Sequence, residues 1–347
     1  MATGALVCAT TILFGLLYAG QAAAQGHVEL GIAINPPLNA ALTEQYVQAA
    51  GARPAVEMWF RTFDTPLFYS TELAQVDSIG ATPMVTWDPM ADGSLVTYPE
   101  ILSGAFDSYF KAQADYVAST HQLIYIRLMH EMNVPSPDTP WGPGSAAGTP
   151  QQFILAWRHI VTIFRQQGAT NARWVWAPNT DCSGACPFTA YYPGDAWVDD
   201  VGLDGYNFAA VHDVPWMSLQ QIFQSSYDIL TKMTTKPVMF TETASTELGG
   251  DKAAWITQGF LTTIPQLFPR VVEVTWWQQI DQTTDWRVNS SPASEAAWRG
   301  VVADPYYGGS GAVATPASSR HVRTARSDSK AHQRCARRSR GCTKVDR

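Results

Sequence analysis

The sequence predicts an α/β protein built as a single (β/α)8 TIM barrel, and three observations lead to this fold class. Eight short apolar segments recur along the chain, and stretches with helical periodicity follow most of them. The alternation runs over about 280 residues, a usual size for one barrel of this kind. No glycine-rich phosphate loop follows the first apolar segment, where "NPPLNA" stands instead. A doubly wound sheet is therefore the less favoured alternative.

The eight apolar segments are continuous runs, as expected for parallel strands that are covered on both faces. The expected strands span residues 27–34, 55–60, 82–87, 123–130, 173–177, 199–206, 236–242 and 271–277. Helical periodicity is clear over residues 99–120 and 149–168. In the second of these, Thr149 is placed as the N-cap before Pro150, and Gly168 ends the helix.

Composition divides the 347 residues into three parts. Residues 1–24 carry no charged side chain, contain the apolar run "ILFGLLYAG", and place Ala22 and Ala24 as a cleavage site. We expect a signal peptide there and hence a secreted, extracellular protein; an uncleaved anchor is the alternative, although the run is short for a membrane span. Residues 25–307 are the expected barrel domain, and residues 308–347 a basic, disordered tail.

Charge is distributed unevenly between the barrel domain and the tail. The tail holds 10 Lys or Arg against 2 Asp or Glu, which leaves 13 basic and 28 acidic residues, a formal net charge of −15, for the rest. This excess of acid argues against nucleic acid as a partner of the barrel. No segment after residue 24 approaches 18 uninterrupted apolar residues, so stable membrane insertion is not expected. We expect a monomer.

The cysteines predict one local crosslink. Removal of the signal peptide removes Cys8 and leaves four, an even number that permits disulfides in an exported protein. The segment "CSGAC" favours a bridge between Cys182 and Cys186 that closes a surface loop. A metal site is the alternative, but no second Cys or His pair accompanies this spacing.

Acidic and aromatic residues gather where the expected strands end, which is the rim that carries the chemistry of a barrel. Glu131 follows the fourth strand and Glu242 ends the seventh, while tryptophans end the third and eighth. Two carboxylic acids in a mouth lined by indoles suit the cleavage of a glycosidic bond. Other acids compete with this pair, namely Asp88, Asp199, Asp200, Asp204 and Glu247. Of these, Asp204 is expected to hold a loop.

Other hydrolytic chemistries have little support. There is no G-x-S-x-G for a serine nucleophile and no H-E-x-x-H for a metal centre. We therefore expect neither a cofactor nor a metal.

Several segments resemble glycoside hydrolase family 26 in that family's order. They are "RLMHEMN" at 127–133 with "WG" at 141–142, "TWDP" at 86–89, "WVWAPN" at 174–179, "YYPGDAWVDDVGLDGYN" at 191–207, "KPVMFTETAS" at 236–245 and "VVEVTWW" at 271–277. The resemblance covers roughly residues 28–305. His before the acid of the fourth strand is a more particular mark of this family and its near relatives, because most related barrel families carry Asn there.

The resemblance implies a role for each matching residue. Glu131 would be the general acid/base and Glu242 the nucleophile of a retaining double displacement, with His130 lining the central sugar subsite. Tyr206 would hydrogen-bond the nucleophile, and Arg127 would supply positive charge beside it. Trp141 would belong to a neighbouring subsite, and Trp276, somewhat favoured over Trp277, would floor the subsite nearest the scissile bond.

The resemblance also implies a substrate class. The family contains endo-β-mannanases, mixed-linkage β-glucanases and β-1,3-xylanases, so the expected partner is a β-linked polysaccharide. The first expectation for the activity is endo-β-1,4-mannanase, and the second is cleavage of mixed-linkage β-1,3-1,4-glucan. The stretch "VPSPDTPWGPG" departs from the family pattern by inserting prolines before the tryptophan. A barrel that binds carbohydrate without cleaving it is the alternative from another class.

Overall fold

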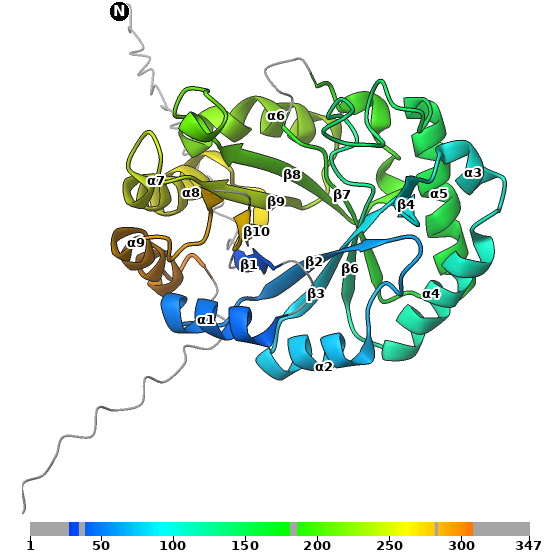
Figure 1. The fold of residues 1–347 in the computed structure, drawn as a ribbon, viewed down its shortest axis with the longest axis horizontal. Coiled ribbons are helices and arrows are strands. Elements are labelled where there is room, and N and C mark those ends of the chain that lie inside the picture. Colours follow the sequence, from blue (N-terminus) through cyan, green and yellow to red (C-terminus); the bar gives the residue numbers. More distant parts are fainter. Residues whose placement is uncertain (1–27, 35–38, 181–185, 282–283, 308–347) are drawn as a thin grey trace, which may run out of the picture. The chain divides into compact units, whose positions relative to one another are not determined.

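The fold is a closed barrel of eight parallel strands, as the sequence predicts (Figure 1). The structure is a computed structural model and describes residues 28–34, 39–180, 186–281 and 284–307. The order around the barrel is β1-β10-β9-β8-β7-β6-β3-β2. The strand bounds are β1 Glu29–Ala33, β2 Val56–Thr62, β3 Thr82–Asp88, β6 Ile124–Leu128, β7 Ala172–Trp176, β8 Asp200–Asn207, β9 Val238–Ser245 and β10 Val271–Trp277.

Alternation along each strand sends side chains either into the barrel or toward the helices. The apolar side chains of the interior are Ala33, Val56, Met58, Met84, Val175, Ala177 and Met239. The opposite faces of the strands join a much larger aromatic and aliphatic layer beneath the helices. The barrel is therefore a packed core, and chemistry is confined to its rim.

Helices surround the barrel in the positions that the periodicity indicates (Figure 1). Their bounds are α1 Ala40–Ala50, α2 Ser70–Ile79, α3 Tyr98–Leu102, α4 Asp107–Thr120, α5 Pro150–Gln166, α6 Leu219–Met233, α7 Lys252–Gln258, α8 Ile264–Leu267 and α9 Pro292–Ala303. The predicted cap of α5 is present: the Thr149 side chain accepts from the backbone N–H of Gln152, and Pro150 is the first helical residue.

Two connections differ from the simple alternation. The expected helix over residues 99–120 is divided into α3 and α4, because Gly104 adopts a φ of 82° between them. The described part of the β7–β8 connection holds only the 3-10 turns η2 (Thr189–Tyr191) and η3 (Asp195–Trp197). Two small hairpins, β4 (Met90–Ala91) with β5 (Ser94–Leu95) and β11 (Ile280–Asp281) with β12 (Thr284–Asp285), lie in rim loops.

The expected signal peptide and basic tail lie outside the described residues, as does Cys182, so the bridge to Cys186 stays a prediction. Within the described residues, no helix has both the length and the apolar character needed to cross a membrane.

Candidate active site

The chain leaves the barrel abruptly after β6, and this exit positions Glu131. Met129 and Glu131 both have left-handed backbones, with φ of 46° and 49°. Such values are uncommon in residues other than glycine and are found at sites where the surrounding structure enforces them. Two backbone hydrogen bonds supply that support, from Met129 N–H to Trp87 O at 2.9 Å and from Glu131 N–H to Ala177 O at 2.9 Å. The rim itself therefore fixes the direction of the Glu131 side chain.

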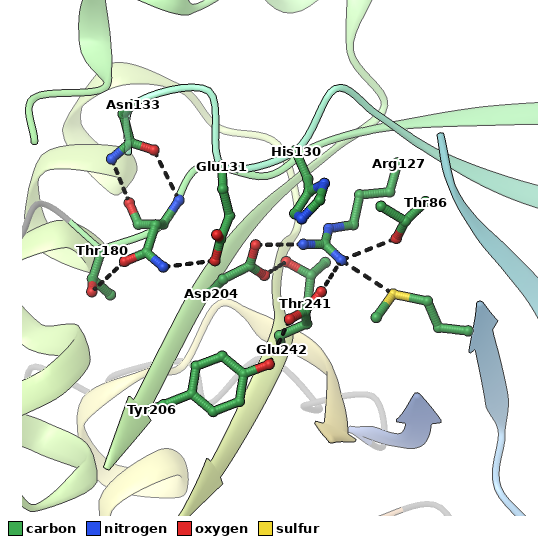
Figure 2. Close-up of polar contacts among 12 residues, drawn as sticks. Thr86, Arg127, His130, Glu131, Asn133, Thr180, Asp204, Tyr206, Thr241 and Glu242 are labelled. Atoms are coloured by element: carbon green, nitrogen blue, oxygen red, sulfur yellow. Dashed lines mark hydrogen bonds and ion pairs between the residues drawn. The ribbon is translucent and has the colours of Figure 1, made fainter. Parts of the chain in front are cut away.

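A pair of asparagines orients the Glu131 carboxyl (Figure 2). The Asn179 amide donates to Glu131 Oε1 at 2.6 Å. Asn133 holds Asn179 in turn: its Oδ1 accepts from Asn179 N–H at 3.0 Å, and its Nδ2 donates to the carbonyls of Asn179 and Cys186. Burial raises the pKa of Glu131 above its ordinary value; His130 and Asn179 oppose this, and the Glu242 charge adds to it. A carboxyl whose pKa is raised in this way suits a general acid.

Glu242 lies on β9 with donors on both carboxylate oxygens. Arg127 Nη1 forms an ion pair with Oε1, and the Tyr206 hydroxyl donates to Oε2 at 2.5 Å. Burial, together with the Glu242 charge, raises the pKa of Tyr206 well above its usual range, so the phenol stays protonated and remains a donor. Glu242 is only 5% exposed. The hydrogen bond expected from Tyr206 and the cation expected from Arg127 are both present in this geometry.

Arg127 is fully buried and links three strands beneath the carboxylates (Figure 2). Its Nη2 contacts Asp204 Oδ2 on β8 at 2.5 Å, and its Nη1 donates to Thr86 Oγ1 on β3 at 3.0 Å. Asp204 also accepts from Thr241 Oγ1 at 2.7 Å. The expectation that Asp204 holds a loop is therefore wrong, because this side chain lies in the barrel centre and pairs with the arginine that binds Glu242. Burial, opposed by Arg127, raises the pKa of Asp204 above its ordinary value.

His130 lies between aromatic rings and an acid at the rim. Its Nδ1 is 3.1 Å from Asp88 Oδ1, and Phe60 and Trp141 contact its ring with centroid distances of 5.5 Å each. Burial and Arg127 lower the pKa of His130, but the charge and hydrogen bond of Asp88 together with the charge of Glu131 raise it, and the net shift is upward. The Trp141 indole N–H donates to the His130 carbonyl at 2.7 Å, and Trp141 is 6% exposed. Trp141 thus packs behind His130 and leaves little of its surface for a sugar.

The two adjacent tryptophans of β10 face opposite sides of the barrel wall, and the preference for Trp276 is wrong. Trp276 is fully buried among Trp255, Phe260 and Trp298 on the helix side, and its indole N–H donates to Trp286 O at 2.9 Å. Trp277 faces inward, with its ring centroid 5.7 Å from that of Phe60 and 6.5 Å from that of Tyr206. Trp277 is therefore the indole of this pair on the inner face, beside the Tyr206 ring.

The sequence reasoning gave no specific role to three residues that contact the predicted site. Asp88, Asn179 and Thr86 lie at or near strand ends, where a polar residue is a weak signal taken alone. The part that each of them plays in the site becomes visible only from its contact with a residue that is distant in the sequence. Within the described residues, no group of three or more His, Cys, Asp or Glu is arranged to hold a metal ion.

Comparison with known proteins agrees with this geometry. Residues 101–265, which include Arg127, Glu131, Tyr206 and Glu242, match the model of glycosyl hydrolase family 26. "Endoglucanase H" of Acetivibrio thermocellus is 36% identical over 228 residues, which is 64% of this chain and 24% of that protein. The chain thus spans about a quarter of the length of this relative.

Solved structures share the fold. The family 26 domain of a Prevotella bryantii endo-β-mannanase/endo-β-glucanase superposes with a TM-score of 0.61 at 13% identity, over 82% of this chain and 91% of that one. A modular endo-β-1,4-mannanase of Cellulomonas fimi gives a TM-score of 0.60 at 19% identity, over 83% and 73% of the two chains. With the matched segment carrying both glutamates and their neighbours on a barrel of this kind, the chain contains a glycoside hydrolase domain that belongs to glycosyl hydrolase family 26.

Proposed function

We propose that the protein is a retaining endo-β-glycanase in which Glu131 is the general acid/base and Glu242 the nucleophile. The observation that carries this proposal is the difference between the surroundings of the two carboxyls. Glu242 receives hydrogen bonds from a cation and a phenol, which orient both of its oxygens. Glu131 receives one from a neutral amide, and its pKa is raised. Two acids with different surroundings are what a double displacement needs.

In the first step, Glu242 attacks the anomeric carbon while Glu131 gives its proton to the leaving glycosidic oxygen. The carbon–oxygen bond to the leaving sugar breaks, and a covalent bond to Glu242 replaces it. In the second step, Glu131 takes a proton from water, whose oxygen attacks the same carbon and releases Glu242. The Tyr206 hydroxyl and the Arg127 guanidinium orient the Glu242 carboxylate for attack in the first step. They stabilise the negative charge that this carboxylate regains in the second step.

For the substrate, we propose a β-glucan first and a β-1,4-mannan second. The order differs from the one that the sequence resemblance implies, and a specific observation supports it. The relative named as an endoglucanase is 36% identical to this chain, whereas the structural neighbours named as mannanases share 12 to 19% and support the fold only. Mixed-linkage β-1,3-1,4-glucan is the β-glucan that the sequence resemblance implies, and β-1,3-xylan stays in the test because the resemblance implies it too.

Rescue by a small nucleophile tests the mechanism. We expect the Glu131→Ala and Glu242→Ala variants to lose about 10³-fold or more of the wild-type turnover on an activated aryl β-glycoside. Azide should restore turnover in both, giving a β-glycosyl azide with Glu131→Ala and the α-anomer with Glu242→Ala. Wild-type turnover by Glu242→Gln would contradict the nucleophile assignment. A barrel that binds carbohydrate without cleaving it would show binding but no turnover in the wild-type protein.

Product sizing tests the substrate and the endo action. Barley β-glucan, glucomannan, mannan and β-1,3-xylan are digested in parallel, and products are measured over time. We expect barley β-glucan to have the highest kcat/KM and to yield mixed oligosaccharides early in the reaction. A higher kcat/KM on mannan would reverse the order of the two substrates and leave the mechanism in place.

We further propose that the protein acts outside the cell, on the strength of the uncharged, apolar N-terminal segment. Fractionation of an expressing culture tests this. Intact protein in the membrane fraction would contradict secretion and favour an anchor.

A further inference from the structure

A hollow of about 300 Å³ lies beside the catalytic centre, at the ends of β2 and β3 and the loop after β2. Its lining residues are Phe60, Arg61, Thr62, Thr65, Tyr69 and Asp88. Two of these belong also to the surroundings of His130: Asp88 pairs with its Nδ1, and Phe60 contacts both its ring and that of Trp277. The hollow therefore adjoins the site of bond cleavage.

Tyr69 is the exposed aromatic ring of this hollow. It is 49% exposed, although the molecule buries most of its large rings. The Arg61 guanidinium lies against the ring, 5.6 Å from its centroid, which steadies the side chain. The fold does not need the ring for capping α2, because the bond there runs from the Tyr69 backbone N–H to Glu72 Oε2 at 2.7 Å. A fixed, half-exposed phenol is the kind of surface on which the C–H face of a sugar packs.

The charges in the hollow are already paired. Arg61 forms an ion pair with Glu72, and Asp88 is held by His130. An anionic ligand would have to compete with Glu72 for the Arg61 guanidinium, and Arg61 is only 7% exposed. The hollow therefore fits a neutral ligand better than an acidic one.

The remaining polar lining suits hydroxyl groups. Thr62 Oγ1 donates its proton to Asp64 at 2.5 Å, and Thr65 Oγ1 donates to the Thr62 carbonyl at 3.1 Å. Each threonine hydroxyl has thus used its donor and keeps lone pairs that accept from a ligand. A sugar ring offers hydroxyl donors at its edge and an apolar face, which match the threonines and Tyr69 respectively.

We infer that this hollow is a sugar subsite outside the cleavage point, in which Tyr69 packs against one neutral hexose unit of the bound polysaccharide. This inference rests on the proposed function and adds a residue that sets the preferred substrate length. A subsite away from the scissile bond contributes only when the substrate is long enough to reach it. Tyr69 should therefore matter for polymers and longer oligosaccharides, and not for the shortest aryl glycoside that is cleaved.

The test compares Tyr69→Ala, Tyr69→Phe and the control Leu123→Ala, in which the lost side chain is 46% exposed at the other end of the barrel. For each, kcat/KM is measured on neutral oligosaccharides of increasing length and on a short activated aryl glycoside. We expect Tyr69→Ala to lose roughly 5- to 20-fold on the longer substrates and to match the wild type on the short one. Tyr69→Phe and Leu123→Ala should stay within about 2-fold throughout.

Equal kcat/KM for Tyr69→Ala and the wild type at every length would overturn the subsite, as would a uniform loss that includes the short glycoside. Failure of the proposed function is a separate result, because it appears as undiminished activity in Glu131→Ala or Glu242→Ala, whatever Tyr69→Ala does.

Discussion

Glu131 reaches its position through backbone conformations that cost energy. Two left-handed residues within three positions cost of order 1 to 3 kcal/mol each when neither is glycine. Packing of the fully buried Met129 and the two backbone bonds to the neighbouring strand ends hold this geometry. The barrel therefore fixes the position of Glu131, and within the described residues Asn179 is the side chain that donates a hydrogen bond to its carboxyl.

Replacement of Asn179 by alanine should move the pH profile. The amide stabilises the ionised form of Glu131, so its removal raises the pKa of this acid further. The proposed mechanism needs Glu131 protonated, so the alkaline limb of kcat/KM should shift upward, by roughly 0.5 to 1 pH unit. The control is Asn171→Ala, which removes amide bonds before β7 at the far end of the barrel. A downward shift, or an equal shift in the control, would contradict the role of Asn179.

Replacement of Tyr206 by phenylalanine should act through Glu242. It removes the 2.5 Å bond to the carboxylate and keeps the ring in place. Hydrogen bonds to charged groups are worth about 1.5 to 3 kcal/mol, so we expect kcat to fall by roughly 10- to 100-fold with a smaller change in KM. Tyr307→Phe removes a buried tyrosine bond to Phe260 O, away from the site, and should lower thermal stability and leave kcat unchanged. Similar kcat in both variants would argue against the orienting role of Tyr206.

At the scale of elements, the loop after β6 explains why the proline-rich insertion does not disturb the site. Its ends are joined by a bond from Ser136 N–H to Pro143 O, and the Tyr98 hydroxyl donates to Trp141 O at 2.7 Å. The loop folds back so closely that a Cβ on Gly142 would lie 1.7 Å from the Val134 carbonyl oxygen. The glycine of the "WG" pair is thus required to bring Trp141 behind His130.

Gly142→Ala tests this packing. The clash is with backbone, so the loop must shift, and we expect a loss of about 2 kcal/mol or more in the free energy of unfolding together with lower activity. Gly300→Ala is the matched control: this helical glycine in α9 has no atom within 4 Å of the added Cβ. It should stabilise the protein by roughly 0.5 to 1 kcal/mol. Denaturant unfolding and Trp fluorescence measure both, and a neutral Gly142→Ala would refute the packing argument.

At the scale of the whole molecule, the sequence predicts the barrel and the two glutamates because both depend on local patterns. Every barrel strand is an apolar run, and each expected range matches the observed one to within three residues at either end. The predictions that were wrong, for Trp276 and Asp204, depended on strand register and on partners distant in the sequence. Alternation requires Trp276 and Trp277 to face opposite ways, but only the pairing of β10 with β1 shows that Trp277, opposite Ala33, faces inward. Asp204 was misjudged because its partner, Arg127, is 77 residues away.

Two buried carboxyls outside the site, Glu57 and Glu273, make stability depend on pH. Neither pairs with a cation within the described residues, and each has an oxygen without a hydrogen-bond partner. Burial raises the pKa of Glu57 to about 7, against a hydrogen bond from Thr43 Oγ1 at 2.6 Å that lowers it. Between about pH 4.5 and 7 the folded state therefore holds a proton that the unfolded chain has released. The free energy of unfolding should fall as the pH rises through this window.

Glu57→Gln should remove the contribution of Glu57 to this dependence of the free energy of unfolding on pH. The glutamine oxygen still accepts from Thr43, and the side chain carries no charge that burial penalises. Relative to the wild type, the free energy of unfolding should gain roughly 1 to 3 kcal/mol between pH 4.5 and 7.5, because 2.5 pKa units set an upper bound of about 3.4 kcal/mol. Urea unfolding at several pH values measures the gain, with Glu44→Gln, an exposed position on the adjoining α1, as the control. Parallel pH curves for Glu57→Gln and the wild type would show that Glu57 is ionised in the folded protein and stabilised by its surroundings.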